Sequence, residues 1–78
     1  MSCAFVLLNV ELAFATEVKE QVERMKNVRE VHRLHGVYDL IAKVEADTPN
    51  DLKDSLTGIR RLNRVHSTVT LTVTHSHP

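Results

Sequence analysis

Residues 36–51, GVYDLIAKVEADTPND, specify a turn, a strand and the start of a helix in direct succession. The Gly36-Val37 pair predicts a tight turn, because glycine reaches backbone conformations that other residues avoid. Apolar side chains then alternate over residues 38–46, which is typical of a strand with one buried face. Thr48-Pro49 provides a capping hydroxyl followed by a proline suited to the first helical position, so a helix is expected to begin there.

The neighbouring segments complete a hairpin and this helix. Residues 28–35 mix apolar and charged side chains, which indicates an edge strand whose charges discourage open-ended pairing. Behind the cap, apolar residues recur at helical spacing and form a stripe of Leu52, Leu56, Ile59 and Leu62. Gly58 lies within this helix, where glycine lowers helix stability by about 1 kcal/mol relative to alanine. A neighbouring group is therefore expected to approach its backbone closely.

The two ends of the chain supply the remaining elements. Residues 4–10, AFVLLNV, are apolar on both alternating faces, which is typical of a strand covered on both sides. Residues 11–15 form a connection without a predicted conformation, and Thr16 is expected to cap a second helix. The apolar face of that helix is formed by Val18, Val22 and Met25. Residues 65–74 alternate between apolar side chains and threonines and predict a last strand.

The element order is therefore βαββαβ, the α+β arrangement called ferredoxin-like. We expect residues 1–78 to form one domain, since the length leaves no room for a second. Right-handed crossovers place residues 4–10 and 38–46 in the middle of a four-stranded antiparallel sheet with both helices on one face. Because residues 4–10 are apolar toward both sides, the other face needs a cover from outside the chain. We expect a second copy there, packed sheet on sheet as in a dimeric α/β barrel.

Charge and cysteine content narrow the class of protein. Ten basic and ten acidic side chains give a formal net charge of zero, whereas DNA-binding domains carry a clustered excess of Lys and Arg, so no direct DNA binding is expected. Cys3 is the only cysteine, which rules out an internal disulfide and fits a reducing compartment. The apolar run at residues 4–8 has no positive residue before it and is too short for a bilayer. A cytoplasmic protein without a membrane segment is expected.

Four stretches of the chain carry a resemblance to a known family. They are residues 5–10 (FVLLNV), 28–31 (VREV), 36–44 (GVYDLIAKV) and 65–71 (VHSTVTL). Together they resemble the effector-binding domain of Lrp/AsnC transcription regulators, and the most specific element is the Gly-x-Tyr-Asp turn that leads into an apolar strand. Members of that family normally carry an N-terminal helix-turn-helix domain, so the chain resembles a stand-alone version without it.

The resemblance implies a regulatory domain that is not an enzyme and needs no cofactor. It implies that copies pair through their sheets into homodimers and that the pairs assemble further into rings. An amino acid or a related small molecule is then expected to bind between pairs, and the domain to modulate transcription through a full-length Lrp/AsnC partner. The ligand-binding residues nominated in this way are Gly36, Val37, Tyr38, Asp39, Ser67, Thr68 and Thr70. The chain departs from the family at residues 11–15, where a glycine-containing turn is frequent.

The residues of the turn support two interpretations. Exposed backbone N–H groups could receive a ligand carboxylate while Asp39 meets the ligand's ammonium group. Alternatively, Gly36 only permits the turn, Tyr38 packs, and Asp39 caps local backbone groups. Composition alone favours the second interpretation, because Gly and Asp are ordinary turn residues, and the resemblance favours the first.

Two other functions are compatible with parts of the sequence. His75 and His77 would project to the same side of an extended chain, and such a pair can begin a copper, nickel or zinc site, with His32 and His35 near the hairpin. No Cys-x-x-Cys or His-Glu-x-x-His pattern completes that site, so no metal is predicted. Small dimeric α/β-barrel monooxygenases share the fold, but they need polar groups inside an enclosed pocket, whereas residues 4–10 are simply apolar.

Overall fold

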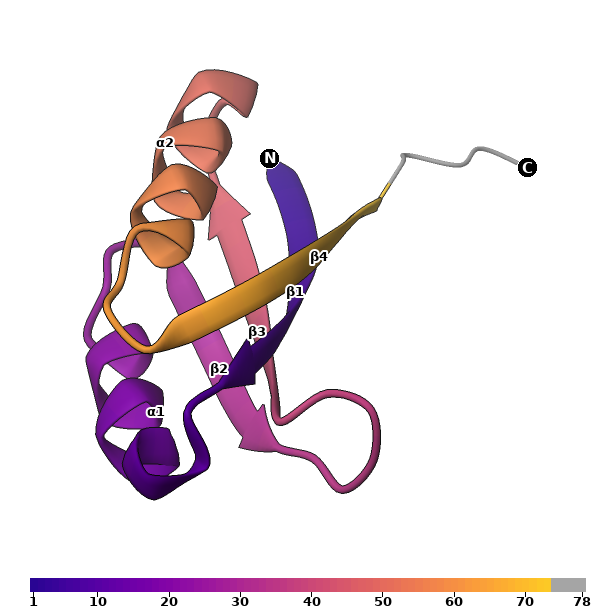
Figure 1. Ribbon diagram of the computed structural model, residues 1–78. Helices are drawn as coiled ribbons and strands as arrows, with labels where there is room; N and C mark the ends of the chain where they lie inside the picture. Colours follow the sequence, from indigo (N-terminus) through magenta and orange to yellow (C-terminus); the bar gives the residue numbers. More distant parts are fainter. Residues whose placement is uncertain (74–78) are drawn as a thin grey trace.

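The structure, a computed structural model, describes residues 1–73 and has the expected ferredoxin-like element order (Figure 1). A short 3₁₀ helix, η1, lies between the first strand and the first helix. The elements are β1 (Ser2–Val10), η1 (Leu12–Phe14), α1 (Ala15–Glu23), β2 (Val28–Arg33), β3 (Leu40–Ala46), α2 (Pro49–Arg60) and β4 (Val65–Val73). No helix of the described part of the chain is long and apolar enough to cross a membrane.

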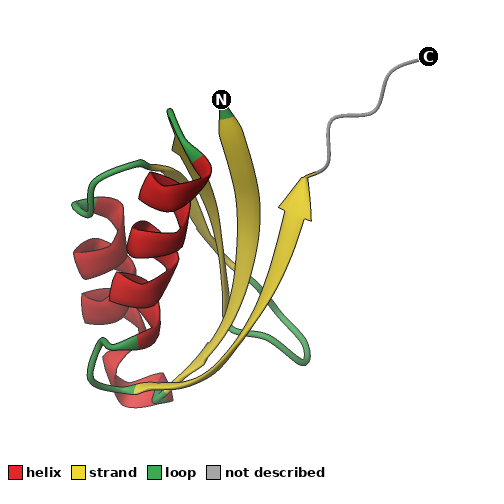
Figure 2. Ribbon diagram, turned by 90° about the horizontal axis from the view of Figure 1, so that it is seen from above, coloured by secondary structure: helices red, strands yellow, loops and turns green. Residues whose placement is uncertain are grey.

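The four strands form one antiparallel sheet in the order β2-β3-β1-β4, so β3 and β1 are central as predicted. Both helices lie on one face of this sheet, as Figure 2 shows from above. The predicted two-layer arrangement is therefore confirmed. The opposite, helix-free face of the sheet carries no element of residues 1–73.

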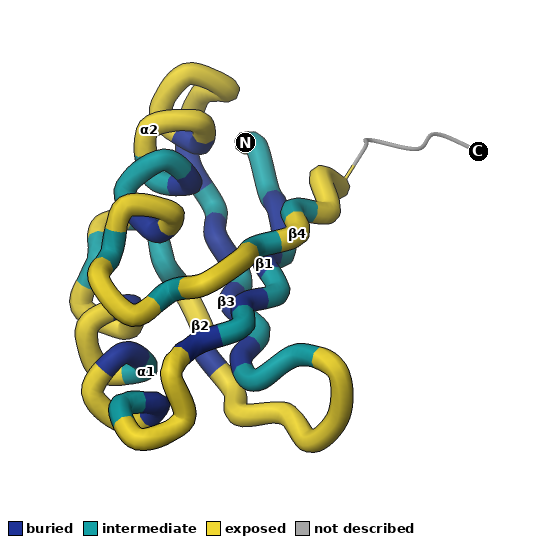
Figure 3. The backbone as a smooth tube through the Cα atoms, viewed as in Figure 1, coloured by how far each residue is buried: buried dark blue, intermediate teal, exposed yellow. Residues whose placement is uncertain are grey.

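The core lies between the sheet and the helices. Alternate residues of β1 and β3 are buried on the helix side, and the buried strand positions are coloured dark blue in Figure 3. Apolar side chains of both helices cover the core on the side opposite the sheet. The largest fully buried side chains are Leu8, Leu40, Ile59, Val6, Val18, Val22 and Val44. This burial of aliphatic side chains supplies the main stabilising free energy of the domain.

The start of α2 matches the prediction from the sequence, whereas the start of α1 does not. The Thr48 hydroxyl accepts a hydrogen bond from the backbone N–H of Asp51 at 3.1 Å, with proline in the first turn. Thr16, the predicted cap of the first helix, instead lies inside α1, which begins at Ala15. The reason is that η1 winds the chain earlier, through a 2.8 Å bond from the N–H of Phe14 to the carbonyl of Glu11.

The predicted two-residue turn between β2 and β3 is a longer loop over residues 34–39. The strand predicted for residues 28–35 ends at Arg33, and the one predicted for residues 38–46 begins at Leu40. Tyr38 and Asp39 precede β3, and the N–H of Asp39 donates to the carbonyl of Leu8 on β1, at 2.9 Å. The predicted last strand, residues 65–74, is found as β4 up to Val73, and Thr74 lies outside the described residues.

The close approach expected at Gly58 is present. A Cβ built on Gly58 would lie 3.0 Å from the terminal methyl of Met25, which follows α1. Nearby, the side-chain amide of Asn27 donates to the hydroxyl of Ser55 on α2, at 3.0 Å. Gly58 therefore lets α2 lie close to the end of α1, and the last residue of the predicted stripe, Leu62, packs against the core from beyond the end of α2.

Candidate functional site: a loop hollow and an apolar sheet face

Loop 34–39 borders a hollow of about 520 Å³ at one end of the sheet. In Figure 1 this loop extends from the ends of β2 and β3, away from the helices. The residues that line the hollow are Leu12, Arg33, Leu34, His35, Gly36 and Asp39. A volume of this size lies within the range of small-molecule sites, which is about 300–1,000 Å³.

Asp39 holds the loop against the central strand. One of its carboxylate oxygens, Oδ2, accepts a hydrogen bond from the backbone N–H of Val10 at 2.9 Å. Its backbone N–H donates to Leu8 and its carbonyl accepts from the N–H of Leu34, at 2.9 and 2.8 Å. The side chain thus bonds to a backbone N–H that is distant in sequence, and not to the local backbone groups of the second interpretation. A contact of Asp39 with a ligand stays a prediction.

Gly36 fixes the shape of the loop tip. Its φ angle of 135° lies in the region that L side chains rarely adopt, and no heavy atom lies within 4 Å of a Cβ placed there. Backbone geometry, not lack of space, therefore requires glycine. Val37 next to it is 82% exposed, and Tyr38 is half-buried. Of the four nominated loop residues, Gly36 and Asp39 line the hollow.

The three nominated residues of β4 do not line this hollow, and they do not share one face of the sheet. Ser67 pairs with Asn9 and accepts a hydrogen bond from its side-chain amide at 3.3 Å. Thr68 and Thr70 pair with Leu8 and Val6, so they lie on the helix side. There the Thr70 hydroxyl accepts a hydrogen bond from the guanidinium of Arg60 at 3.1 Å. Within one copy, the predicted site is thus divided between the loop and the far edge of the sheet.

Three residues of the hollow, Leu12, Arg33 and Leu34, were missed by sequence reasoning, and His35 was considered only in connection with a metal site. The sequence pattern marks Arg33, which ends β2, only as one of the charges of an edge strand. Leu12 belongs to the connection over residues 11–15, for which no conformation was predicted. Only the fold brings η1 beside a loop that α1 and β2 separate from it in the sequence, so no local pattern could have identified these residues.

The helix-free face changes from polar to apolar across the sheet. The strand register aligns His32, Ile41, Leu7 and Val69 in one row, and Glu30, Lys43, Phe5 and Leu71 in the next. On β4, Val69, Leu71 and Val73 are 38%, 52% and 51% exposed, and Figure 3 shows β4 exposed over most of its length. We call the following residues the apolar half of the face: Phe5, Leu7, Ile41, Val69, Leu71 and Val73.

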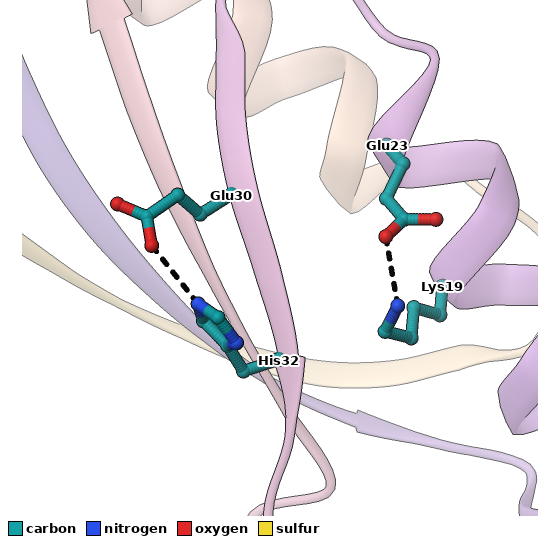
Figure 4. A network of polar contacts seen from close by, with 4 residues as sticks. All are labelled: Lys19, Glu23, Glu30 and His32. Carbon is teal, nitrogen blue, oxygen red and sulfur yellow. Dashed lines mark hydrogen bonds and ion pairs between the residues drawn. The ribbon is translucent and has the colours of Figure 1, made fainter.

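Charged side chains occupy the β2 side of the same face. The His32 ring nitrogen Nε2 lies 3.0 Å from Oε1 of Glu30, and Figure 4 draws this pair on β2 and the Lys19–Glu23 pair on α1. The hydrogen bond from His32 lowers the pKa of Glu30 below its ordinary value. These charges keep the β2 side hydrated, so the surface that lacks a cover is the apolar half.

Within residues 1–73, no group of three His, Cys, Asp or Glu side chains lies close enough to hold a metal ion. His75 and His77, the pair considered for a metal site, lie outside the described residues. His32 is engaged with Glu30, and His35 lies at the hollow.

Residues 3–77 match the family model of the Lrp/AsnC ligand binding domain. The chain belongs to this family. The match covers nearly the whole chain, so the resemblance seen in the sequence is confirmed. The family is one of regulatory domains that bind small molecules, which supports a function of that general kind for this Lrp/AsnC domain.

Several solved structures share both fold and sequence with this Lrp/AsnC domain. FFRP-DM1 is 36% identical with a TM-score of 0.90, over 95% of this chain and 100% of that one. A hypothetical protein from Pyrococcus horikoshii is 36% identical with a TM-score of 0.89, over 99% and 94%. A protein from Thermus thermophilus is 33% identical with a TM-score of 0.90, over 100% and 99%. Escherichia coli AsnC, at 21% identity and a TM-score of 0.85, shares the fold.

The domain is also similar to a segment of two enzymes. Over 57 residues it is 37% identical to the homocitrate synthase of Sulfurisphaera tokodaii and 35% identical to that of Sulfolobus acidocaldarius. The match covers 73% of this chain and 12% of each enzyme. The chain therefore spans only a small part of the length of these relatives, and the similarity concerns one segment of them.

Proposed function

We propose that the chain is a metabolite sensor that binds an amino acid at loop 34–39 and transmits this binding through its assembly with other subunits. The observation that carries the proposal is the hollow beside the Gly-x-Tyr-Asp loop in a chain of the Lrp/AsnC ligand-binding family. Function is argued from this site, because the ferredoxin-like fold alone serves many unrelated functions.

The loop offers donors for a ligand's carboxylate. Among the described residues, no backbone hydrogen bond occupies the N–H groups of residues 35–37, whereas those of Leu34 and Asp39 are already paired. Successive free amides in a bent loop form a concavity that receives anions. Since the loop is anchored to β1 through Asp39, a ligand that orders the loop also acts on the central strand of the sheet.

An NMR titration tests ligand binding. We expect one or more of the standard amino acids, added singly to the ¹⁵N-labelled chain, to shift the amide signals of Gly36 and Asp39 at millimolar or lower concentration. The signal of Lys53 on α2, outside the hollow, is the internal control. Shifts confined to α2 and β4, or none with any amino acid, would contradict the proposal.

We propose that a second copy covers the apolar half of the helix-free face. Packing the two faces together buries Leu71 and Val73, whose side chains are half exposed in one copy. A two-fold arrangement opposes like surfaces, so the apolar half of one copy can meet that of the other while the charged β2 side stays at the rim.

A matched pair of variants tests this assembly. Leu71→Glu places a charge in the middle of the apolar half, and we expect it to give a monomer in sedimentation velocity at micromolar concentration. Thr72→Glu adds the same charge on the helix side of the same strand and should leave the oligomer intact. A wild-type monomer, or equal dissociation by both variants, would refute the proposed interface.

The output of the sensor requires a partner. With a formal net charge of zero, the chain itself is not expected to bind duplex DNA with sub-micromolar affinity at physiological salt, which a gel shift can check. We propose a full-length Lrp/AsnC regulator as the partner that carries the DNA-binding element. Sedimentation of the chain mixed with such a regulator from the same organism should show a mixed species.

The similarity to homocitrate synthase favours a second class of partner. A segment related to this domain occurs within the length of an enzyme, so a domain of this kind can accompany a metabolic enzyme instead of a regulator. If mixed species form with neither class of protein, the domain acts through its own assembly.

A further inference from the structure

We infer that the hollow beside loop 34–39 selects its ligand by a carboxylate and an apolar body rather than by an ammonium group, so that apolar 2-oxo acids bind as the corresponding amino acids do. This inference rests on the proposed function and names the chemical class of the ligand. It follows from three properties of the side chains that line the hollow.

The positive side chain at the hollow is free to meet an anion. Arg33 lines the hollow and is exposed, and among the described residues no carboxylate lies within ion-pair distance of its guanidinium. An arginine keeps its charge at all physiological pH values and presents a fork of donors that matches a carboxylate. His35 lines the hollow as well. Together with the N–H groups of residues 35 and 36, which no backbone hydrogen bond occupies, these donors favour one carboxylate.

One of the two carboxylate oxygens of Asp39, Oδ2, is already engaged. Asp39 accepts the hydrogen bond from the N–H of Val10, which is part-buried, and its backbone is bonded on both sides. A ligand ammonium drawn to Oδ2 would compete with the contact that holds the loop on β1. Leaving a buried N–H without an acceptor is costly, so the anchor is the better use of Asp39. We therefore assign Asp39 to positioning the loop.

The rest of the lining is apolar. Leu12 and Leu34 border the hollow and are 71% and 37% exposed in one copy. An aliphatic group placed against them removes apolar surface from water, which is favourable in proportion to the area covered. A short carboxylic acid with a branched aliphatic chain matches both the donors and these leucines.

Three probes of one shape separate carboxylate from ammonium recognition. Leucine has both groups, 4-methyl-2-oxopentanoate has only the carboxylate, and leucinamide has only the ammonium. We expect leucine and the 2-oxo acid to shift the Gly36 amide with dissociation constants within about threefold of each other, and leucinamide to bind at least about tenfold more weakly.

Two arginine variants provide the matched control. Arg33→Gln removes the charge at the hollow and should raise the dissociation constants of leucine and the 2-oxo acid about tenfold or more. Arg29→Gln removes the same charge from the same strand, where the side chain pairs with Glu45 outside the hollow, and should change either affinity by less than about twofold. Unchanged amide dispersion in the spectra of both variants shows that each is folded.

The outcomes distinguish the inference from the proposed function. If leucinamide binds at the loop as well as leucine does, or if leucine binds and the 2-oxo acid does not, recognition depends on the ammonium and the inference is overturned, while the loop remains the site. If Arg33→Gln and Arg29→Gln weaken binding equally, the charge at the hollow has no special role and the inference is again overturned. If no probe and no amino acid shifts the loop signals, both the inference and the proposed function are wrong.

Discussion

The two glycines of the chain make a matched test of why loop 34–39 has its shape. Gly36→Ala introduces a Cβ where the space is open but where φ is 135°, so the whole cost is backbone strain. Residues other than glycine held in such regions cost about 1–3 kcal/mol. Each kcal/mol lowers the melting temperature of a domain of this size by roughly 4–8 °C. We therefore expect a clear fall in melting temperature.

Gly58→Ala is the control, with the opposite expectation. Alanine is favoured over glycine inside a helix by about 1 kcal/mol. The new methyl meets only the end of the flexible Met25 side chain, 3.0 Å away, which must shift by a few tenths of an ångström. The net change should therefore be small or stabilising.

Thermal unfolding followed by far-ultraviolet circular dichroism measures both variants. All samples need the same protein concentration, because the melting temperature of a self-associating chain depends on it. A Gly36→Ala variant with the melting temperature of the wild type would refute the argument from backbone geometry. An equal fall for both variants would show that loss of any glycine destabilises the chain for a reason unrelated to φ.

Three further predictions concern single contacts. Asp39→Ala leaves the N–H of Val10 without its acceptor and should lower the free energy of unfolding, measured by urea denaturation, by about 1–3 kcal/mol. It should also weaken effector binding. Asp39→Asn keeps an acceptor oxygen and should restore most of the stability. His32→Ala should return the pKa of Glu30 toward its ordinary value in a ¹³C NMR titration. The stabilisation from this contact is present above the glutamate pKa of the unfolded chain and is lost as pH falls through the lowered pKa of the folded chain. The variant should therefore lose this pH dependence of its stability. Thr48→Ala removes the cap of α2 and should cost about 1 kcal/mol; an unchanged denaturation midpoint would contradict the capping role.

The features that the sequence predicted well are those set by local patterns. The cap at Thr48 depends on residues within one helical turn, and the alternation in residues 4–10 depends only on the two-residue period of a strand. The sheet order followed because right-handed crossovers leave few arrangements for βαββαβ. The family resemblance was equally readable, since its motifs are contiguous stretches of sequence.

The features that were missed depend on contacts distant in sequence. Loop 34–39, which is longer than predicted, is held by bonds from Asp39 to Leu8 and Val10 of β1, and nothing in the sequence near Asp39 reveals these partners. The hollow brings together Leu12 and Arg33, which belong to η1 and β2. The side of the sheet taken by each β4 residue depends on its register with β1, including the irregularity between Asn9 and Val10.

The two outer strands of the sheet have different consequences for the solubility of the chain. Charged residues along β2 oppose the addition of a further strand there, whereas residues 67–73 of β4, STVTLTV, have no charge and no proline along an edge that pairs only with β1. Such a segment, rich in β-branched residues, is a template for uncontrolled strand addition and for amyloid-like growth when it is left open. Where the proposed second copy is absent, β4 presents both this open edge and the half-exposed side chains of Leu71 and Val73 to solvent, so the same strand bears on solubility and on the proposed assembly.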